Sequence, residues 1–358
     1  MKKRIIVGLL LAVSLMMTAC GGAADSKTTT AAETKAEAEA TTAMGKEAST
    51  EKQEVSDVVK DAKAEQFSGA KNEEKKSMAL FMSHMTNEFV KTLSSSVQKE
   101  AEELGYTGDS FKIYDGKNDV ATQVSQIEQA VTLGVDGIII EPVSTDGIVK
   151  AVKDAEKAGV KVVILNQRIS DQNAADTFVG ADNESTGAAL MKKVMEDLEG
   201  KGNIVELLGP MGSDGQVGRS KGFDSVLAEY PDVKVIASDS ADWDTAKALT
   251  LTENWLTSSD IQAVVAQNDG MAVGAAQAVK EAGLTDKIKV YGVDATSDGL
   301  NAIANGGMTG TVSQGTEDQG KISADLCSNL IYGQSVPKEV IATNVVYTKE
   351  NVNEILKK

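Results

Sequence analysis

The segment QAVVAQNDGMAVGAAQAV, residues 262–279, decides the fold, because it changes from a strand pattern to a helix pattern across a polar turn. Residues 261–266 form a short apolar run that is typical of a buried strand. A helix is predicted to begin at Asp269, whose carboxylate suits the N-cap position. Asn268 then stands at the carboxyl end of the strand. In an open parallel α/β sheet, ligands bind at that edge.

A second copy of this arrangement follows at VYGVDATSD, residues 290–298, where Asp294 holds the place that corresponds to Asn268. Polar residues at two adjacent strand ends predict the floor of a small-molecule site. Asn268 and Asp294 are therefore expected to contact the same ligand.

Apolar strand patterns alternate with helix patterns from Met78 onward, which predicts an α/β fold with parallel sheets covered on both faces. The alternation restarts after TFVGAD, residues 177–182, so two doubly wound lobes are expected. Late elements complete earlier lobes, and several chain crossings make a hinge. The predicted N-terminal lobe is 77–181 plus 315–342, and the predicted C-terminal lobe is 182–314 plus 343–358.

The N-terminus reads as a processing signal, because basic residues precede a short apolar run that ends in Met-Thr-Ala-Cys at Cys20. This ending resembles a bacterial lipobox, which implies a lipoprotein signal peptide at residues 1–19 and lipidation of Cys20. The alternative is an ordinary secretory signal with a chance cysteine. Residues 20–75 are rich in Ala, Thr, Lys and Glu and predict a disordered tether. The expected location is therefore the extracytoplasmic face of the cell membrane, through the lipid anchor only.

Composition and missing motifs exclude several functions. The net charge of −17 argues against nucleic acid and anionic membrane surfaces as partners. A single histidine, His84, cannot form a catalytic triad or a histidine-cluster metal site alone. With Cys20 lipidated, Cys327 has no disulfide partner and is expected to be a buried apolar residue. Neither a dinucleotide fingerprint nor a phosphate loop is present, so we expect no enzyme, metal or cofactor.

Amides, carboxylates, a guanidinium and two aromatic rings follow the predicted strands and form the candidate ligand site. This mixture suits a polyhydroxylated ligand, because each hydroxyl both donates and accepts hydrogen bonds. The aromatic rings can cover apolar C–H faces of a sugar from opposite lobes. The candidate residues are Ser83, Asn87, Phe89, Glu141, Asn166, Gln167, Arg219, Trp243, Asn268, Asp294 and Gln314.

From Met78 to about Val346 the chain resembles a periplasmic sugar-binding protein of the ribose and galactose/glucose type. The segments that carry the resemblance are SHMTNEF, IIIEPVSTDG, FVGADNESTG, ADWDTAKAL, AQNDGMAVGA, YGVDATSDG and GTVSQ. The resemblance implies an extracytoplasmic receptor of an ABC importer, with two lobes, a three-stranded hinge and ligand between the lobes. By position, the ligand contacts of that family fall on Asn87, Phe89, Asn166, Arg219, Trp243, Asn268, Asp294 and Gln314.

The chain departs from both family types. The ribose type has an Asp-Arg pair where Asn166-Gln167 stands and a second phenylalanine where Val90 stands. The galactose type has an acidic residue where Gly215 stands, and its calcium loop is absent here. The ligand can therefore be a hexose, a pentose, a cyclitol such as inositol or a sugar alcohol. The protein is expected to be a monomer.

Three other functions are alternatives to a transport receptor. A LacI-type repressor would need a basic helix-turn-helix at the N-terminus, and an enzyme would need a reactive constellation of side chains. A ligand-sensing co-receptor for chemotaxis or a sensor kinase is compatible with the sequence and is the alternative to transport.

Overall fold

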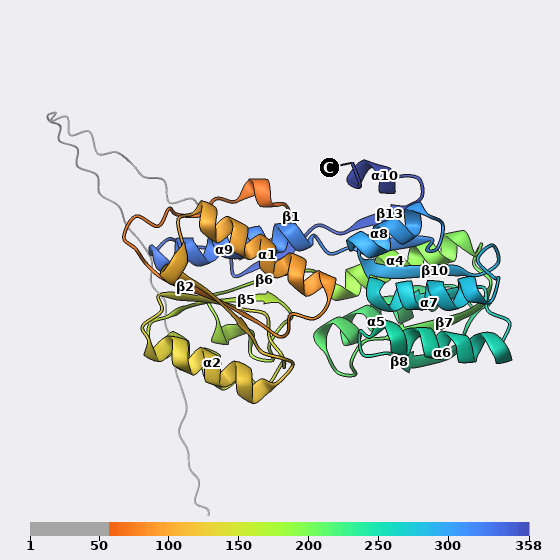
Figure 1. The fold of residues 1–358 in the computed structure, drawn as a ribbon, viewed down its shortest axis with the longest axis horizontal. Helices are drawn as coiled ribbons and strands as arrows, with labels where there is room; N and C mark the ends of the chain where they lie inside the picture. Colours follow the sequence, from red (N-terminus) through yellow and green to blue (C-terminus); the bar gives the residue numbers. More distant parts are fainter. Residues whose placement is uncertain (1–56, 358) are drawn as a thin grey trace, which may run out of the picture. The chain divides into compact units, whose positions relative to one another are not determined.

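A computed structural model describes residues 57–357 as two lobes, each built around its own sheet (Figure 1). The predicted signal peptide, Cys20 and the tether as far as residue 56 lie outside the described residues. Among residues 57–357, no helix combines the length and the apolar character that crossing a membrane requires.

The N-terminal lobe holds a seven-stranded sheet in which every neighbouring pair is parallel. Helices cover both faces, with α1 and α9 on one and α2 and α3 on the other. In spatial order the strands are β1 (Val58–Ala62), β12 (Glu339–Ala342), β6 (Thr177–Gly180), β5 (Lys161–Asn166), β4 (Gly137–Ile140), β2 (Met78–Met82) and β3 (Phe111–Asp115). The helices are α1 (Glu88–Glu103), α2 (Val120–Thr132), α3 (Val149–Lys157) and α9 (Thr316–Ile331).

The C-terminal lobe holds a six-stranded sheet that is parallel except for its edge strand β13, which runs antiparallel to β11. Its strands, in spatial order, are β13 (Val345–Thr348), β11 (Gly310–Ser313), β10 (Lys289–Asp294), β9 (Ala263–Ala266), β7 (Gly202–Leu208) and β8 (Val233–Ser240). The helices are α4 (Asn183–Asp197) and α5 (Asp214–Leu227) on one face, and α6 (Thr245–Ser258), α7 (Asp269–Glu281), α8 (Ser297–Ala304) and α10 (Val352–Ile355) on the other. The predicted pair of parallel-sheet lobes is confirmed.

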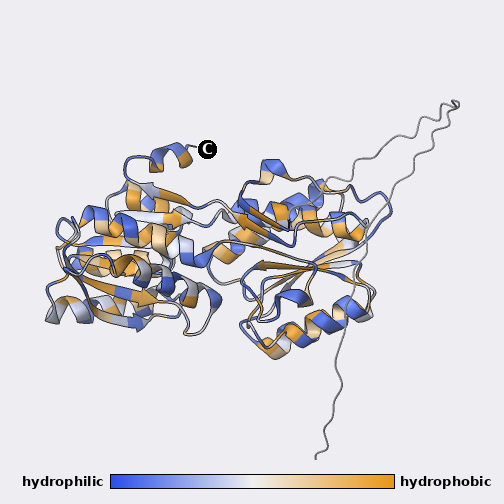
Figure 2. Ribbon diagram, turned by 180° about the vertical axis from the view of Figure 1, so that it is seen from behind, coloured by the Kyte–Doolittle hydropathy of each residue, from blue (hydrophilic) through white to orange (hydrophobic). Residues whose placement is uncertain are grey.

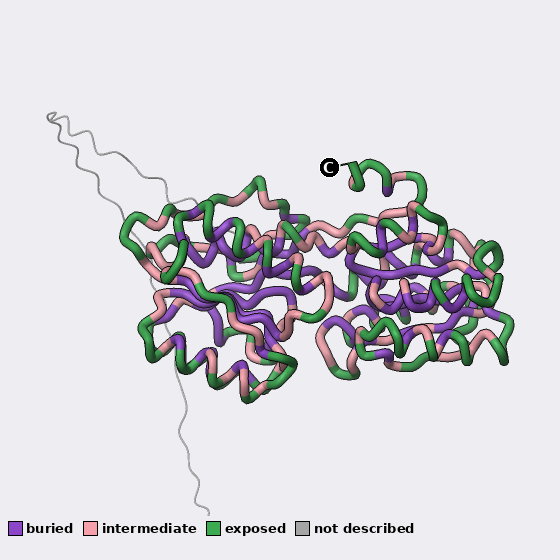
Figure 3. The backbone as a smooth tube through the Cα atoms, in the orientation of Figure 1, coloured by how far each residue is buried: buried purple, intermediate pink, exposed green. Residues whose placement is uncertain are grey.

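The central strands are buried on both faces, which explains their uninterrupted apolar sequences. In β2, Met78, Leu80 and Met82 pack in the core beneath α1 and α9, whereas Ala79 and Phe81 pack beneath α2 and α3. The hydropathy pattern is mixed along the helices and apolar along these strands (Figure 2). The backbone trace shows the same division, with buried strands between helices that are exposed on their outer sides (Figure 3).

The chain passes between the two sheets three times: from β6 to α4, from β11 to α9 and from β12 to β13. At the second crossing, Gly315 has a φ of 65°, in the left-handed region that favours glycine. A side chain there would also meet the Cβ of Ala342, which belongs to β12, at 3.0 Å. Two of the crossings therefore lie side by side and constrain one another.

The predicted tether was wrong at its C-terminal end, because residues 58–62 form strand β1 at the edge of the first sheet. The segment after β1 is held by side chains of α9: Asn329 accepts from the backbone N–H of Ala70, and Ser328 donates to the Ala70 carbonyl. This segment has few large apolar residues. Backbone pairing with β12 and polar side chains of α9 supply the order that its composition does not.

Candidate functional site

A small cavity between the lobes brings together every predicted site residue except Ser83. The cavity measures about 50 Å³ and lies at the carboxyl ends of strands from both sheets. Its lining consists of His84, Asn87, Phe89, Val90, Glu141, Asn166, Gln167, Asn183, Gly215, Arg219, Trp243, Asn268, Asp294 and Gln314. The rule that ligands bind at strand ends thus selected a set of residues that converge in space.

Asn268 is itself the N-cap of α7, since its side chain accepts the backbone N–H of Met271 at 2.9 Å. The prediction that Asp269 would cap this helix was wrong. Asp269 is the first residue of α7 and is fully buried, and its carboxylate accepts hydrogen bonds from Thr296 and Thr311. Both residue types cap helices well, so the sequence alone did not decide between two adjacent candidates.

Asp294 lies at the end of β10 with a φ of 122°, which is unusual for a residue with a side chain. Gln314, at the end of the neighbouring strand, donates to its carboxylate at 2.6 Å. Burial raises the pKa of Asp294 to about 6, and the positive charge of Arg219 limits that rise. Asp294 is therefore an acceptor whose charge changes close to neutral pH.

Arg219 is the guanidinium of the cavity and comes from α5. One of its terminal nitrogens donates to the Gln267 carbonyl, and its Nε is buried without a partner. Its guanidinium carbon lies 5.5 Å from the centre of the Trp243 ring, in a cation–π arrangement. Leaving a buried donor unpaired costs free energy, and a ligand acceptor beside Arg219 Nε would remove that cost.

The Trp243 ring occupies space that Gly209 leaves free, because a Cβ on Gly209 would lie 2.1 Å from the ring. Phe89 faces the same cavity from α1 in the other lobe. The structure thus places the two predicted aromatic residues in one cavity from opposite lobes.

On the N-terminal lobe, Glu141 is held by two donors: the backbone N–H of Ser83 and the side-chain amide of Gln167, each at 2.8 Å. Burial raises the pKa of Glu141, and these hydrogen bonds oppose the rise. Ser83 is buried and does not line the cavity, which differs from the prediction. Its backbone N–H positions the carboxylate of Glu141.

Asn87 and Asn166 complete the amide set on this side. The Asn87 side chain caps α1 by accepting the N–H of Val90 at 2.9 Å. Asn166 has a φ of 64°, and its amide donates to Gln319 at 3.3 Å. Asparagine tolerates this left-handed backbone better than most residues, and that conformation ends β5 beside the cavity.

Asn183 lines the cavity and was missed from the sequence. Its amide nitrogen donates to Asp214 at 2.9 Å. Its Oδ1 is buried and has no hydrogen-bond partner. The signal was available, because Asn183 follows a strand end as Asn268 does and belongs to the segment FVGADNESTG, but Asn183 is not among the predicted site residues. His84, Val90 and Gly215 also line the cavity without having been selected as site residues.

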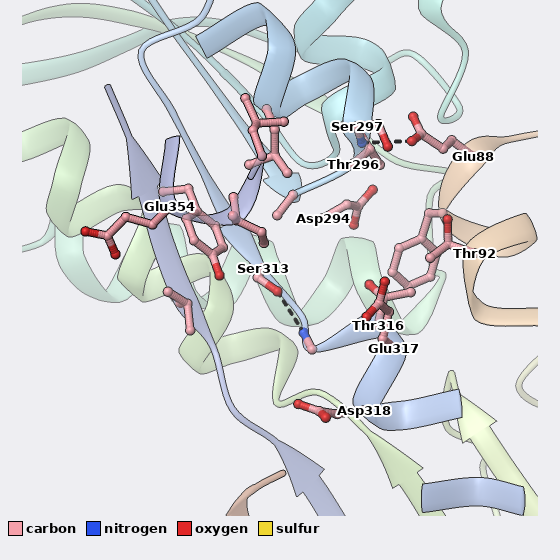
Figure 4. A pocket seen from close by; sticks show the side chains of 18 of the residues that line it. Glu88, Thr92, Asp294, Thr296, Ser297, Ser313, Thr316, Glu317, Asp318 and Glu354 are labelled. Atoms are coloured by element: carbon pink, nitrogen blue, oxygen red, sulfur yellow. Dashed lines mark hydrogen bonds between the residues drawn. The ribbon is translucent and has the colours of Figure 1, made fainter. Parts of the chain in front are cut away.

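A larger cavity of about 820 Å³ adjoins the crossings and shares Phe89 and Asp294 with the smaller one. Figure 4 shows Asp294, Thr316 and Glu317 lining it together with Glu88. Its charged lining residues are all acidic: Glu88, Asp294, Glu317, Asp318 and Glu354.

A family model for the periplasmic binding protein domain matches residues 78–335. The chain belongs to the periplasmic binding protein family. Together with the ribose import binding protein and the ABC transporter solute-binding protein to which the chain is similar, this match confirms the resemblance to sugar-binding proteins of ABC importers. The matched residues run from β2 through both sheets to the end of α9.

Two curated relatives of this periplasmic binding protein have named ligands. The xylitol-binding protein of Mycolicibacterium smegmatis is 39% identical over 238 residues, which cover 66% of this chain and 68% of the relative. The ribose import binding protein of Bacillus subtilis is 33% identical over 277 residues, 77% of this chain and 88% of that protein.

A solved structure shows the same fold with a ligand in place. An ABC transporter solute-binding protein from Bacillus halodurans with bound myo-inositol is 31% identical, with a TM-score of 0.74, and the match covers 78% of this periplasmic binding protein and 97% of that chain.

Proposed function

We propose that this periplasmic binding protein captures a monosaccharide or a related polyol between its lobes and delivers it to an ABC importer. The observation that carries the proposal is the lining of the small cavity. Phe89 and Trp243 face it from opposite lobes, and Asp294, Arg219 and five side-chain amides that were selected from the sequence surround it. Hydroxyl groups need both donors and acceptors, and C–H faces need flat apolar surfaces.

Relatives that are named for xylitol and ribose, and a structural neighbour with bound myo-inositol, support this ligand class. The cavity of about 50 Å³ holds only a few water molecules, each of which needs about 10–15 Å³. Ligand entry therefore requires the lobes to move apart. We propose that residues 77–181 with 315–342 move against 182–314 with 343–358, about the three crossings.

We further propose that lipid on Cys20 holds the protein at the extracytoplasmic face of the cell membrane. Palmitate labelling in a bacterial host tests this anchor: wild type should carry the label and sediment with membranes, and Cys20→Ala should lose both properties. Equal labelling of the two proteins would overturn the anchor and leave the binding proposal intact.

Calorimetric titration of the full-length chain with ribose, xylitol, allose and myo-inositol tests the binding proposal. We expect at least one of these to bind and the same ligand to bind much more weakly to Asp294→Ala. Asp286→Asn is the matched control, because this exposed aspartate lies in the same lobe outside the cavity. No binding across the panel, or full affinity in Asp294→Ala, would contradict the assignment.

A further inference from the structure

A carboxylate of the N-terminal lobe bonds directly to the C-terminal lobe. Glu88, in the first turn of α1, belongs to the N-terminal lobe, and its Oε1 accepts the backbone N–H of Ser297 at 2.8 Å. Its Oε2 accepts the N–H of Asp298 at 3.3 Å. Both donors belong to α8 in the C-terminal lobe, and the contact lies beside Asp294 in the larger cavity (Figure 4).

The donors are the ones that α8 cannot satisfy itself. The first N–H groups of any helix lack intrahelical acceptors. Thr296 caps α8 and accepts the N–H of Gly299 at 3.1 Å. Ser297 and Asp298 stand before Gly299, and Glu88 of the other lobe supplies their acceptors. The negative charge also lies at the positive end of the α8 dipole, where it is favourable.

The contact connects the two segments that a ligand would bridge. Glu88 stands between Asn87 and Phe89, which line the small cavity from the N-terminal lobe. On the other side, Ser297 is the first residue of α8 and follows Asp294, at the end of β10, by three residues. A ligand that contacts Asn87, Phe89 and Asp294 together therefore brings Glu88 within hydrogen-bond distance of the start of α8.

We propose that Glu88 is an interlobe latch, a positioning residue that stabilises the closed arrangement of the lobes without touching the ligand. Its effect on affinity rests on the proposed function, but the latch itself does not. Removing it should favour the open arrangement and weaken ligand affinity by about two- to fivefold, the range that one exposed charge–dipole contact supplies.

Hydrogen exchange at the latch donors gives a direct readout on the full-length, ligand-free chain. Exchange at the amides of Ser297 and Asp298 is expected to be faster in Glu88→Ala than in wild type. Glu88→Gln keeps an acceptor oxygen and loses the charge, so it should fall between them. A role confined to the stability of α1 would leave these amides of the other lobe unchanged.

Glu184→Gln is the matched control, since Glu184 lies in the first turn of α4 and is exposed. It should leave exchange at residues 297 and 298 and ligand affinity as in wild type. Unchanged exchange in Glu88→Ala would overturn the latch, and faster exchange with unchanged affinity would overturn its role in closure. If wild type bound no polyol, the proposed function would fail while the exchange result still decided whether the latch exists.

Discussion

The carboxylate of Asp269 accepts the hydroxyl of Thr311 at 2.7 Å, and this buried bond joins the start of α7 to strand β11. The other oxygen of Asp269 accepts the backbone N–H of Thr296 at 2.9 Å, at the start of α8. Two glycines make room for the carboxylate, because a Cβ on Gly292 or Gly299 would lie 2.2 or 2.3 Å from its oxygens. Asp269 thus fixes the strand ends that carry Asn268 and Asp294.

Replacing Asp269 by alanine is expected to lower the free energy of unfolding by about 2–4 kcal/mol, because the buried Thr311 and the half-buried Thr296 lose their acceptor. Denaturant unfolding of the full-length chain measures this. A double-mutant cycle with Thr311→Val isolates the pair, and its coupling energy should exceed about 0.5 kcal/mol. Additive effects of the two substitutions would show that the bond contributes little.

Ligand affinity is expected to depend on the charge of Asp294, whose pKa burial raises to about 6. Below pH 6 the carboxyl gains a proton and loses acceptor capacity, so affinity should fall by at most about tenfold per pH unit. Above pH 7 the carboxylate is charged and affinity should be constant. Titration calorimetry between pH 5 and pH 8 measures the profile.

Asp294→Asn is the control for this profile, since the amide keeps the shape of the side chain and does not titrate. Its affinity should be lower than that of wild type at pH 7.5 and should change less than that of wild type between pH 5 and pH 8. A wild-type affinity that does not change across this range would show that ligand binding is indifferent to the charge on Asp294.

Pattern and topology explain why most residues selected from the sequence line one cavity. Asn268 and Asp294 end adjacent parallel strands, so their proximity follows from strand order alone. Which side chains face the cavity depends on local geometry that a pattern does not carry. Ser83 follows a strand in the same way and bonds to Glu141 instead, and Asn183 lines the cavity although it is not among the predicted site residues.

The edges of the sheets were the least predictable part. Residues 58–62 were expected to belong to a disordered tether, but the structure has strand β1 there, at the edge of the first sheet. Strand β1 is ordered by pairing with β12, which is distant in sequence. Short edge strands depend on such partners more than on their own composition, so local patterns identify them poorly.

Ligand binding is expected to change the fluorescence of one of the two tryptophans. Trp243 lines the cavity, whereas Trp255 belongs to α6, packs against the core and is not among the lining residues. Trp255→Phe should therefore retain the ligand-induced change, and Trp243→Phe should lose it. Trp243→Ala is expected to weaken affinity by about tenfold through lost contact with the apolar face of the ligand. A signal that follows Trp255 would place the ligand elsewhere.

Glu206 is expected to make the stability of the C-terminal lobe depend on pH. One oxygen accepts from Ser238 at 3.1 Å, and the other is buried without a partner. Burial raises the pKa of Glu206 to about 7. Between pH 4.5 and pH 7 the folded state holds a proton that the unfolded state has released, so stability falls as pH rises through this window.

Replacing Glu206 by glutamine removes the ionised form and should raise the free energy of unfolding at pH 8 by about 1–3 kcal/mol, with little change at pH 4. The exposed Glu253 of the same lobe supplies the control, because Glu253→Gln should leave the pH profile unchanged. Denaturant unfolding at both pH values measures the difference. Equal stability of wild type and Glu206→Gln at pH 8 would mean that water reaches the carboxylate and that its burial carries no penalty.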